Sequence, residues 1–213
     1  MNFMHSSFIE DVTLADRIKI FFDENPENFW KFYGLAMDSN DPDTPTDGKK
    51  STDMRIDDFN YPLIKELCDQ IQIVLNEYIE IYPWCNRGSA FRLVPFNIQK
   101  YNPGEGFLEW HAENITFLPP ALYRHLVFQM FCDDIEEGGG TEFYHQDTII
   151  KSEKGKVVIF PAQWMFAHRG IVTDQEKTIA TGWYEFFDYN DPTKDISGAW
   201  KTQPQFEGPM SQS

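Results

Sequence analysis

Two histidines and one acidic residue are placed where they could bind a single metal ion. His111 and Glu113 are separated by one residue in EWHAEN, and His168 follows in FPAQWMFAHRG. On a β-strand, residues i and i+2 face the same side about 6.5 Å apart, so an imidazole and a carboxylate could reach a common ion. Such a set of three ligands leaves other coordination positions open for small molecules.

The ligand types admit more than one chemistry. Two histidines and a carboxylate on a β-scaffold are typical of non-haem Fe(II) oxygenases, whereas the same residues with water could hold catalytic zinc. In a third interpretation the histidines are incidental and the protein is a non-catalytic binding module. A chain with 34 acidic residues also contains such pairs by chance, and His145-Gln146-Asp147 is a second one. From the residues alone, either pair could supply metal ligands.

Helices are expected ahead of these candidate ligands. Apolar residues at helical spacing predict one helix from about Leu14 to Asp23 and a longer one from Tyr61 to Tyr78, where Pro62 suits a first turn. Between them, Asp38–Asp53 is rich in Asp, Pro, Thr and Gly, a composition that predicts a loop.

After Gly88 the pattern changes to short runs of β-branched and aromatic residues separated by Gly, Pro and Asn. This pattern predicts an antiparallel sandwich or barrel, and we expect a double-stranded β-helix (jelly roll) buttressed by the N-terminal helices. We therefore divide the chain into helical support and a loop at 1–90, the β-core at 91–187 and a polar surface tail at 188–213. The expected strands are Phe91–Val94, Ile98–Tyr101, Phe107–His111, His125–Phe131, Thr141–Tyr144, Thr148–Lys151, Lys156–Phe160, Phe166–Arg169 and Lys177–Phe187.

Composition limits the partners. The chain has 213 residues and a formal net charge of −16, and an acidic surface repels phosphate backbones, so we expect no binding to bulk nucleic acid. No apolar run is long enough for a transmembrane helix, and residues 1–12 lack a signal-peptide pattern. An odd number of cysteines, Cys68, Cys85 and Cys132, without a CxxC pair favours reduced thiols in the cytoplasm.

Taken in order, the motifs resemble the Fe(II)/2-oxoglutarate-dependent dioxygenases, specifically the prolyl-4-hydroxylase-like branch and its bacteriophage-encoded members. The resemblance runs from about Phe91 to Phe186 and includes GGGTEF and KGKVVIFPA. It implies that His111, Glu113 and His168 are iron ligands, although the family more often has Asp at the second position. It also argues against His145 and Asp147, because in the family the segment matching GGGTEFY leads out of the barrel wall and several strands separate the two parts of the ligand set.

The resemblance also assigns the cosubstrate site. Lys177, nine residues after His168, matches the basic residue that binds the distal carboxylate of 2-oxoglutarate, and a buried dicarboxylate needs such a cation. Thr181 shares the strand parity of Lys177, and Tyr101 matches a tyrosine that faces the cosubstrate. A second tyrosine common among relatives is replaced near Phe131, so its hydrogen bond would be missing or supplied elsewhere.

The activity implied is hydroxylation of a substrate C–H bond, coupled to conversion of 2-oxoglutarate and O₂ to succinate and CO₂, with ascorbate often restoring the iron. A peptidyl proline or another protein side chain is the substrate that the resemblance suggests. A cytoplasmic enzyme, in the host cytoplasm if the gene is phage-encoded, is the expected setting. Arg124 and Arg169 could either bind substrate or cover the surface, while Trp110, Trp164 and Trp183 are expected to be packing residues.

Overall fold

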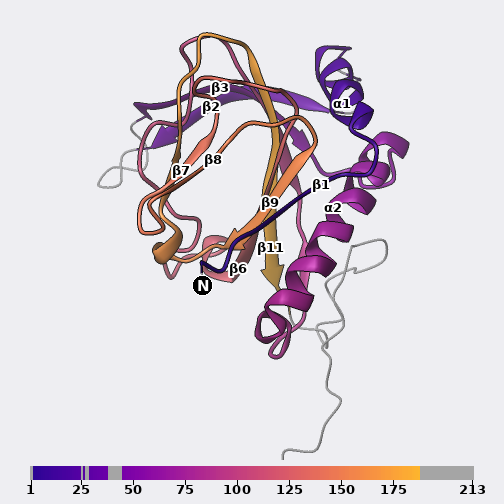
Figure 1. Cartoon of the computed structure of the whole chain (residues 1–213), viewed down its shortest axis with the longest axis vertical. Helices are drawn as coiled ribbons and strands as arrows, with labels where there is room; N and C mark the ends of the chain where they lie inside the picture. The colour runs from indigo at the N-terminus through magenta and orange to yellow at the C-terminus, as the bar shows by residue number, and fades with distance from the viewer. Residues whose placement is uncertain (1, 25, 27–28, 38–44, 188–213) are drawn as a thin grey trace, which may run out of the picture.

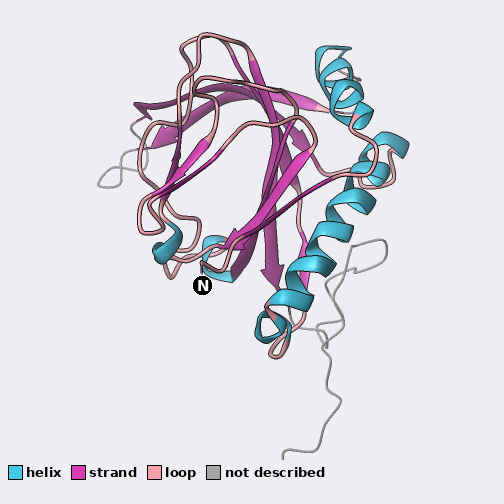
Figure 2. Ribbon diagram, in the orientation of Figure 1, coloured by secondary structure: helices cyan, strands magenta, loops and turns pink. Residues whose placement is uncertain are grey.

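The computed structural model describes residues 2–24, 26, 29–37 and 45–187. Two antiparallel sheets enclose the interior, and the two α-helices pack on one side of the molecule, against the larger sheet (Figures 1 and 2). This arrangement is the expected jelly roll with buttressing helices.

The larger sheet collects strands from the whole described chain. Its order is β1 (His5–Phe8), β9 (Lys156–Pro161), β6 (Arg124–Phe131), β11 (Lys177–Phe186), β5 (Phe96–Tyr101), β3 (Pro45–Ile56) and β2 (Trp30–Met37), with β4 (Phe91–Leu93) paired to β11. The smaller sheet consists of β10 (His168–Gly170), β7 (Thr141–Phe143) and β8 (Thr148–Ile150). Short 3₁₀ turns occupy Pro83–Asn86, Ala121–Tyr123 and Trp164–Phe166.

Both predicted helices are present, as α1 (Thr13–Glu24) and α2 (Pro62–Ile81). In α2 the apolar residues fall on one face, and Pro62 occupies the first turn, where its missing N–H is not needed. That face packs against β1 and β9. As described by the structure, α2 does not qualify as a membrane span, and neither does α1.

Two apolar clusters hold the layers together. The larger one lies between the helices and the larger sheet and includes Leu67, Ile71 and Phe128. The smaller one lies between the two sheets and joins Phe143 of β7 to Phe160 of β9. Each large side chain that is fully buried contributes about 1.5–3 kcal/mol, so the interior between the sheets is a rigid support for polar groups placed beside it.

The structure corrects three expectations. Part of the predicted loop, from Pro45 onward, is strand β3, while residues 38–44 and the predicted tail at 188–213 lie outside the described residues. Segment 1–90 therefore supplies strands β1, β2 and β3 as well as helices. The stretch Phe107–His111 is not a strand, although isolated bridges join its ends to Lys49 and His168.

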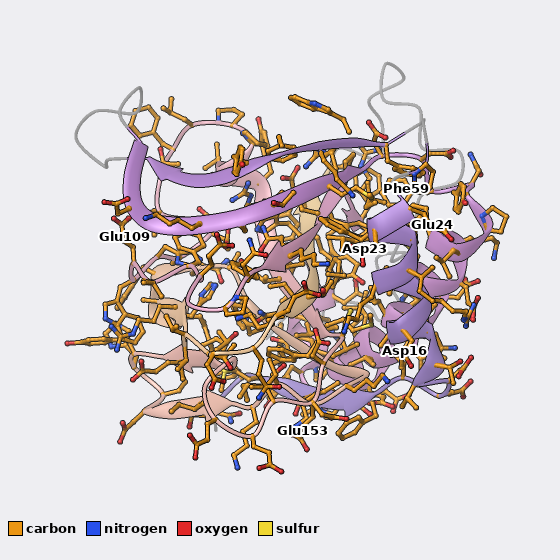
Figure 3. The ribbon with its side chains drawn as sticks, turned by 90° about the horizontal axis from the view of Figure 1, so that it is seen from above. Asp16, Asp23, Glu24, Phe59, Glu109 and Glu153 are labelled. Carbon is orange, nitrogen blue, oxygen red and sulfur yellow. The ribbon has the colours of Figure 1, made fainter. Side chains whose placement is uncertain are left out.

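The correction at β3 has a physical cause. Its sequence, PTDGKKSTDMRI, is polar and rich in turn-forming residues, so its own pattern does not favour a strand. Strands β2 and β5 lie on either side of it and pair with its backbone, and these hydrogen bonds outweigh a weak local preference. The view in Figure 3 shows the long hairpin of β2 and β3 crossing above the barrel, with Glu109 beside one end.

Candidate metal and cosubstrate site

The structure brings together the three predicted metal ligands. One ligand atom from each of His111, Glu113 and His168 lies within 4.8 Å of the others, and this is the metal-type cluster found among the described residues. Glu113 Oε1 is 3.6 Å from His111 Nε2 and 3.9 Å from His168 Nε2. The donor set fits a divalent ion with open positions, which is the arrangement expected of a non-haem Fe(II) site.

Tertiary pairing, rather than a continuous strand, positions the ligands. His111 and His168 exchange backbone hydrogen bonds of 3.0 and 2.8 Å, and the Glu113 N–H donates to the carbonyl of Ala162 at 3.1 Å. His168 begins β10, whereas His111 and Glu113 lie in an irregular segment. The predicted proximity is therefore present, but the strand that was expected to produce it is not.

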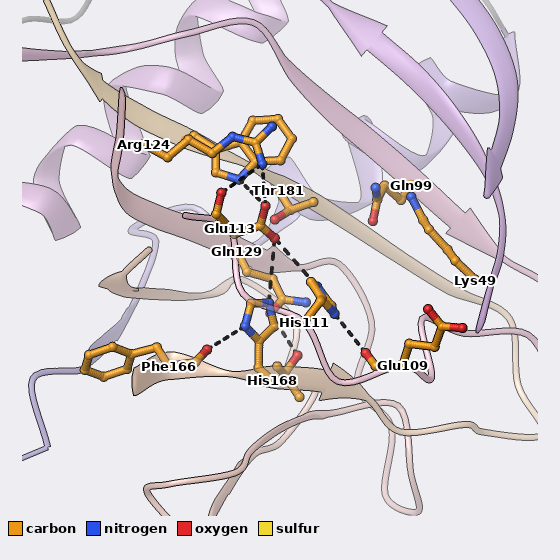
Figure 4. Close-up of polar contacts among 12 residues, drawn as sticks. Lys49, Gln99, Glu109, His111, Glu113, Arg124, Gln129, Phe166, His168 and Thr181 are labelled. Carbon is orange, nitrogen blue, oxygen red and sulfur yellow. Dashed lines mark hydrogen bonds and ion pairs between the residues drawn. The ribbon is translucent and has the colours of Figure 1, made fainter. Parts of the chain in front are cut away.

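Each imidazole is oriented by a backbone carbonyl. His111 Nδ1 lies 2.9 Å from the carbonyl oxygen of Glu109, and His168 Nδ1 lies 2.9 Å from that of Phe166 (Figure 4). A ring nitrogen that donates to a carbonyl leaves the other one unprotonated for a metal. Phe107 also stacks on His111, with ring centroids 3.6 Å apart. Both Nε2 atoms are thus directed to the cluster.

The second oxygen of Glu113 is occupied by two donors. Glu113 Oε2 accepts from Arg124 Nη1 at 2.7 Å (Figure 4). It also accepts from Trp183 Nε1 at 2.8 Å. The Arg124 guanidinium lies 3.7 Å from the centroid of the Trp183 ring. These contacts hold Oε2 away from the cluster and leave Oε1 facing the histidines. The sequence leaves the role of Arg124 open and predicts only packing for Trp183, because nothing in it links either residue to Glu113.

Burial and neighbouring charge set protonation states that suit metal binding. Burial, followed by the charge of His111, lowers the pKa of His168 to about 4, and burial also lowers the pKa of His111. Burial alone would raise the pKa of Glu113, but the combined effect of the two histidines, Arg124 and the Trp183 hydrogen bond lowers it. At neutral pH the cluster therefore presents two neutral imidazoles and one carboxylate.

The cluster opens onto a pocket of about 310 Å³ that Lys177, Tyr101 and Thr181 also line. Lys177 is 2% exposed. Its Nζ donates to the Gly139 carbonyl at 3.1 Å and lies 4.8 Å from the centroid of the Tyr101 ring. Burial lowers the pKa of Lys177 to about 8. The structure therefore places all three predicted cosubstrate residues at one pocket.

Lys177 differs from two other cations nearby. Lys49 pairs with Asp53 at 2.9 Å, and Arg124 pairs with Glu113 at 2.7 Å. Within the described part of the chain, no carboxylate lies within ion-pair distance of Lys177. A buried cation without a carboxylate is costly unless a ligand supplies the anion, so Lys177 is the cation best suited to a dicarboxylate cosubstrate.

Three polar side chains complete the pocket wall. Thr181 donates to the Phe128 carbonyl at 3.1 Å, and Thr141 donates to Gln129 at 2.8 Å. Phe131, near which the resemblance implies the replacement of a second tyrosine, is fully buried in the apolar cluster between the sheets. Thr141 and Gln129 line the pocket instead and offer polar groups there.

Strand β3 contributes a buried ion pair that the sequence pattern does not predict, and its Lys49 lines the pocket. Lys49 and Asp53 belong to β3, the strand that had been predicted to be a loop. Asp53 is 1% exposed and also accepts from Ser51 Oγ at 2.6 Å. The alternation of Lys49, Ser51 and Asp53 at a spacing of two was the signal that could have identified a strand with a polar inner face.

The competing pair lies elsewhere. His145 and Asp147 are in the turn between β7 and β8, and both are exposed. His145 makes ring contacts with Tyr144 and Trp164 rather than with the metal cluster. Neither residue of this pair belongs to the cluster of metal-type ligands.

Arg169, whose role the sequence leaves open, and Trp164, which was expected to pack, both lie at the surface. Arg169 donates to Glu142 at 2.8 Å, and its guanidinium lies 4.5 Å from the centroid of the Trp110 ring. Trp164 is 62% exposed, so the expected packing role is wrong for this residue.

Comparison with known proteins agrees with this geometry. The model of the 2OG-Fe(II) oxygenase superfamily matches residues 96–185. No curated protein sequence is significantly similar to the chain.

Similar solved structures include three prolyl hydroxylases. The viral collagen prolyl hydroxylase of Paramecium Bursaria Chlorella virus-1 has 16% identity and a TM-score of 0.62, with 87% of this chain and 97% of that one covered. A Pseudomonas putida prolyl-4-hydroxylase has 12% identity and a TM-score of 0.62, with 86% and 92% covered. A Trichoplax adhaerens prolyl hydroxylase, solved with a hypoxia inducible factor peptide fragment, has 12% identity and a TM-score of 0.60, with 87% and 84% covered.

These structural likenesses establish the fold, and the family match adds the chemistry. The superfamily uses Fe(II), 2-oxoglutarate and O₂, and the matched segment holds the metal cluster together with Lys177. A zinc hydrolase or a binding module would not need Lys177, which is buried and has no carboxylate within ion-pair distance among the described residues. Residues 96–185 therefore form a 2OG-Fe(II) oxygenase domain.

Proposed function

We propose that this oxygenase hydroxylates a C–H bond of a protein substrate, with a peptidyl proline as the first candidate. In the balanced reaction, substrate, 2-oxoglutarate and O₂ give hydroxylated substrate, succinate and CO₂. The observation that carries the proposal is the open-sided cluster of His111, Glu113 and His168 next to a buried Lys177 without a carboxylate partner among the described residues.

The residues of the chain divide the work. His111 Nε2, His168 Nε2 and Glu113 Oε1 would hold Fe(II), which with the cosubstrate and O₂ supplies the oxidising chemistry. Lys177 binds the distal carboxylate and so directs the other end of 2-oxoglutarate to the metal cluster. The apolar cluster between the sheets, which includes Phe143 and Phe160, limits access of water to the pocket. No side-chain acid or base is needed to remove the substrate hydrogen.

Support for a peptidyl substrate comes from the neighbours. Three similar structures are prolyl hydroxylases, and one of them was solved with a peptide fragment. The viral origin of one neighbour is also consistent with a phage-encoded enzyme. A cytoplasmic location is supported by the three free cysteines among the described residues.

Spectroscopy tests the metal chemistry. Protein loaded anaerobically with Fe(II) and 2-oxoglutarate should show the weak visible charge-transfer band of a metal chelated by the cosubstrate. Absence of the band when both components are demonstrably bound would favour the zinc hydrolase.

Mass spectrometry tests the substrate. Host-cell lysate proteins incubated with the loaded enzyme and O₂ should gain one oxygen atom at proline, with enzyme lacking 2-oxoglutarate as the control. A synthetic peptide of the modified site, and the same peptide with alanine in place of proline, then test the residue. Oxygen gained at another residue type would reject proline but keep the oxygenase.

A further inference from the structure

A buried chain of hydrogen bonds connects strand β3 to the cosubstrate pocket. Lys49 Nζ and Gln99 Nε2 each donate to Asp53 Oδ2 at 2.9 Å, and the Tyr101 hydroxyl donates to Gln99 Oε1 at 2.7 Å. All four residues are at most 7% exposed. Lys49 and Gln99 lie side by side in Figure 4.

The chemistry of the groups fixes the direction of every bond in this chain. An ionised carboxylate only accepts hydrogen bonds, so the end of the Gln99 amide that faces Asp53 must be its NH₂ group. The opposite end, which faces Tyr101, must then be the amide oxygen. A phenol hydroxyl can donate only one hydrogen bond, and here the Gln99 oxygen accepts it. Reversing the amide would place two acceptors against each other at Asp53.

We infer that Gln99, held by Asp53, is a positioning residue that accepts the only hydrogen bond the Tyr101 hydroxyl can donate, so that this hydroxyl cannot donate to the cosubstrate. This departs from the expectation that Tyr101 contacts the cosubstrate directly, and it rests on the proposed function because it concerns 2-oxoglutarate binding. The Tyr101 oxygen keeps only lone pairs for the pocket, which a carboxylate does not bind. Tyr101 instead acts through its ring, which faces the Lys177 ammonium at 4.8 Å.

The hydrogen bond from Tyr101 to Gln99 favours cosubstrate binding by Lys177. Lys177 carries the distal carboxylate, and its position depends on neighbours that do not compete for that anion. A ring face meets this need, and the hydroxyl of the same residue is held by Gln99, two residues earlier on β5. Asp53, paired with Lys49, holds Gln99 from β3, so the hairpin of β2 and β3 supports the cosubstrate site.

A double-mutant cycle tests the inference. The measured quantity is the Kd of 2-oxoglutarate, obtained by calorimetry on anaerobic Mn(II)-loaded protein, with urea unfolding as a second measurement. In the otherwise unchanged protein, Tyr101→Phe should change the Kd less than about threefold while lowering stability, because only the bond to Gln99 is lost. In a Gln99→Met background the Tyr101 proton is free for the carboxylate, so Tyr101→Phe should weaken binding about tenfold or more.

If Gln99 had only a structural role, the effect of Tyr101→Phe on the Kd would be the same with and without Gln99. Asp53→Asn gives a second background that keeps polar contacts, because an amide at position 53 can donate to Gln99 and allow it to turn. Tyr101→Phe should again weaken binding about tenfold there.

Two results would overturn the inference. One is a tenfold loss on Tyr101→Phe in the otherwise unchanged protein, and the other is an equal effect of Tyr101→Phe in all backgrounds. A complete lack of 2-oxoglutarate binding by the unmutated protein would instead overturn the proposed function, so the two failures are distinguishable.

Discussion

Replacing Lys177 with methionine should stabilise the ligand-free protein and, at the same time, remove tight 2-oxoglutarate binding. Burial lowers the pKa of Lys177 from 10.5 to about 8. Because one pKa unit corresponds to about 1.4 kcal/mol, holding this charge in the interior costs the folded protein about 3 kcal/mol at pH 7. Methionine leaves the Gly139 carbonyl without its donor, at a cost of about 1 kcal/mol. The net expectation is about 2 kcal/mol of added stability.

The stability difference between the two proteins should depend on pH, because Lys177 has different pKa values in the folded and unfolded chain. Below pH 8 the lysine is protonated in both the folded and the unfolded chain, and the full cost is present. Between about pH 8 and 10.5 the unfolded chain binds more protons, so the stability of the unmutated protein rises with pH through this group. The advantage of Lys177→Met should therefore shrink across that window and reverse near its upper end, where only the loss of about 1 kcal/mol from the missing donor to Gly139 remains.

The assay compares urea unfolding of the two proteins at pH 7 and pH 10. Lys151→Met, at an exposed lysine, is the matched control and should change the free energy of unfolding by less than about 0.5 kcal/mol. Calorimetry with the metal-loaded proteins should show a loss of about 150- to 5,000-fold in 2-oxoglutarate affinity on Lys177→Met, because one partner of a buried ion pair is removed. A variant less stable than the unmutated protein at pH 7, or an affinity loss below tenfold, would refute the reasoning.

Three further outcomes follow from the site. His111→Ala should abolish stoichiometric Fe(II) binding, whereas His145→Ala should keep the iron stoichiometry; the opposite result would move the metal site. Trp183→Phe removes a donor to Glu113 and should weaken Mn(II) or Fe(II) binding about 10- to 100-fold in anaerobic titrations, and unchanged affinity would show that the hydrogen bond does not orient the ligand. Affinity for 2-oxoglutarate should fall by up to about tenfold per pH unit above pH 8, because Lys177 must regain its proton before it can bind the carboxylate. Binding at pH 9 should therefore take up a proton, which calorimetry in buffers of different ionisation enthalpy measures. Absence of proton uptake would exclude Lys177 as the titrating group.

Local pattern was sufficient for much of the architecture. Both helices and most strands after Gly88 were predictable, since apolar spacing and turn residues act over a few neighbours. The set of His111, Glu113, His168 and Lys177 was readable only because its order matches the 2-oxoglutarate oxygenase motifs, since the residue types alone left a zinc site and a non-catalytic module open. The jelly roll followed from the strand pattern and the resemblance together.

Tertiary structure alone decided how those residues are held. Strand β3 exists because β2 and β5 pair with its backbone on both sides, which no local propensity of a polar segment can indicate. The partners of Glu113 Oε2 come from β6 and β11, and the carboxylate that accepts from Gln99 comes from β3. Hydrogen bonds depend on distance and direction in space, and chain positions 11 to 70 residues apart carry no record of either. The identity of the candidate ligands was therefore in the sequence, while the direction of their protons and lone pairs was fixed only by the fold.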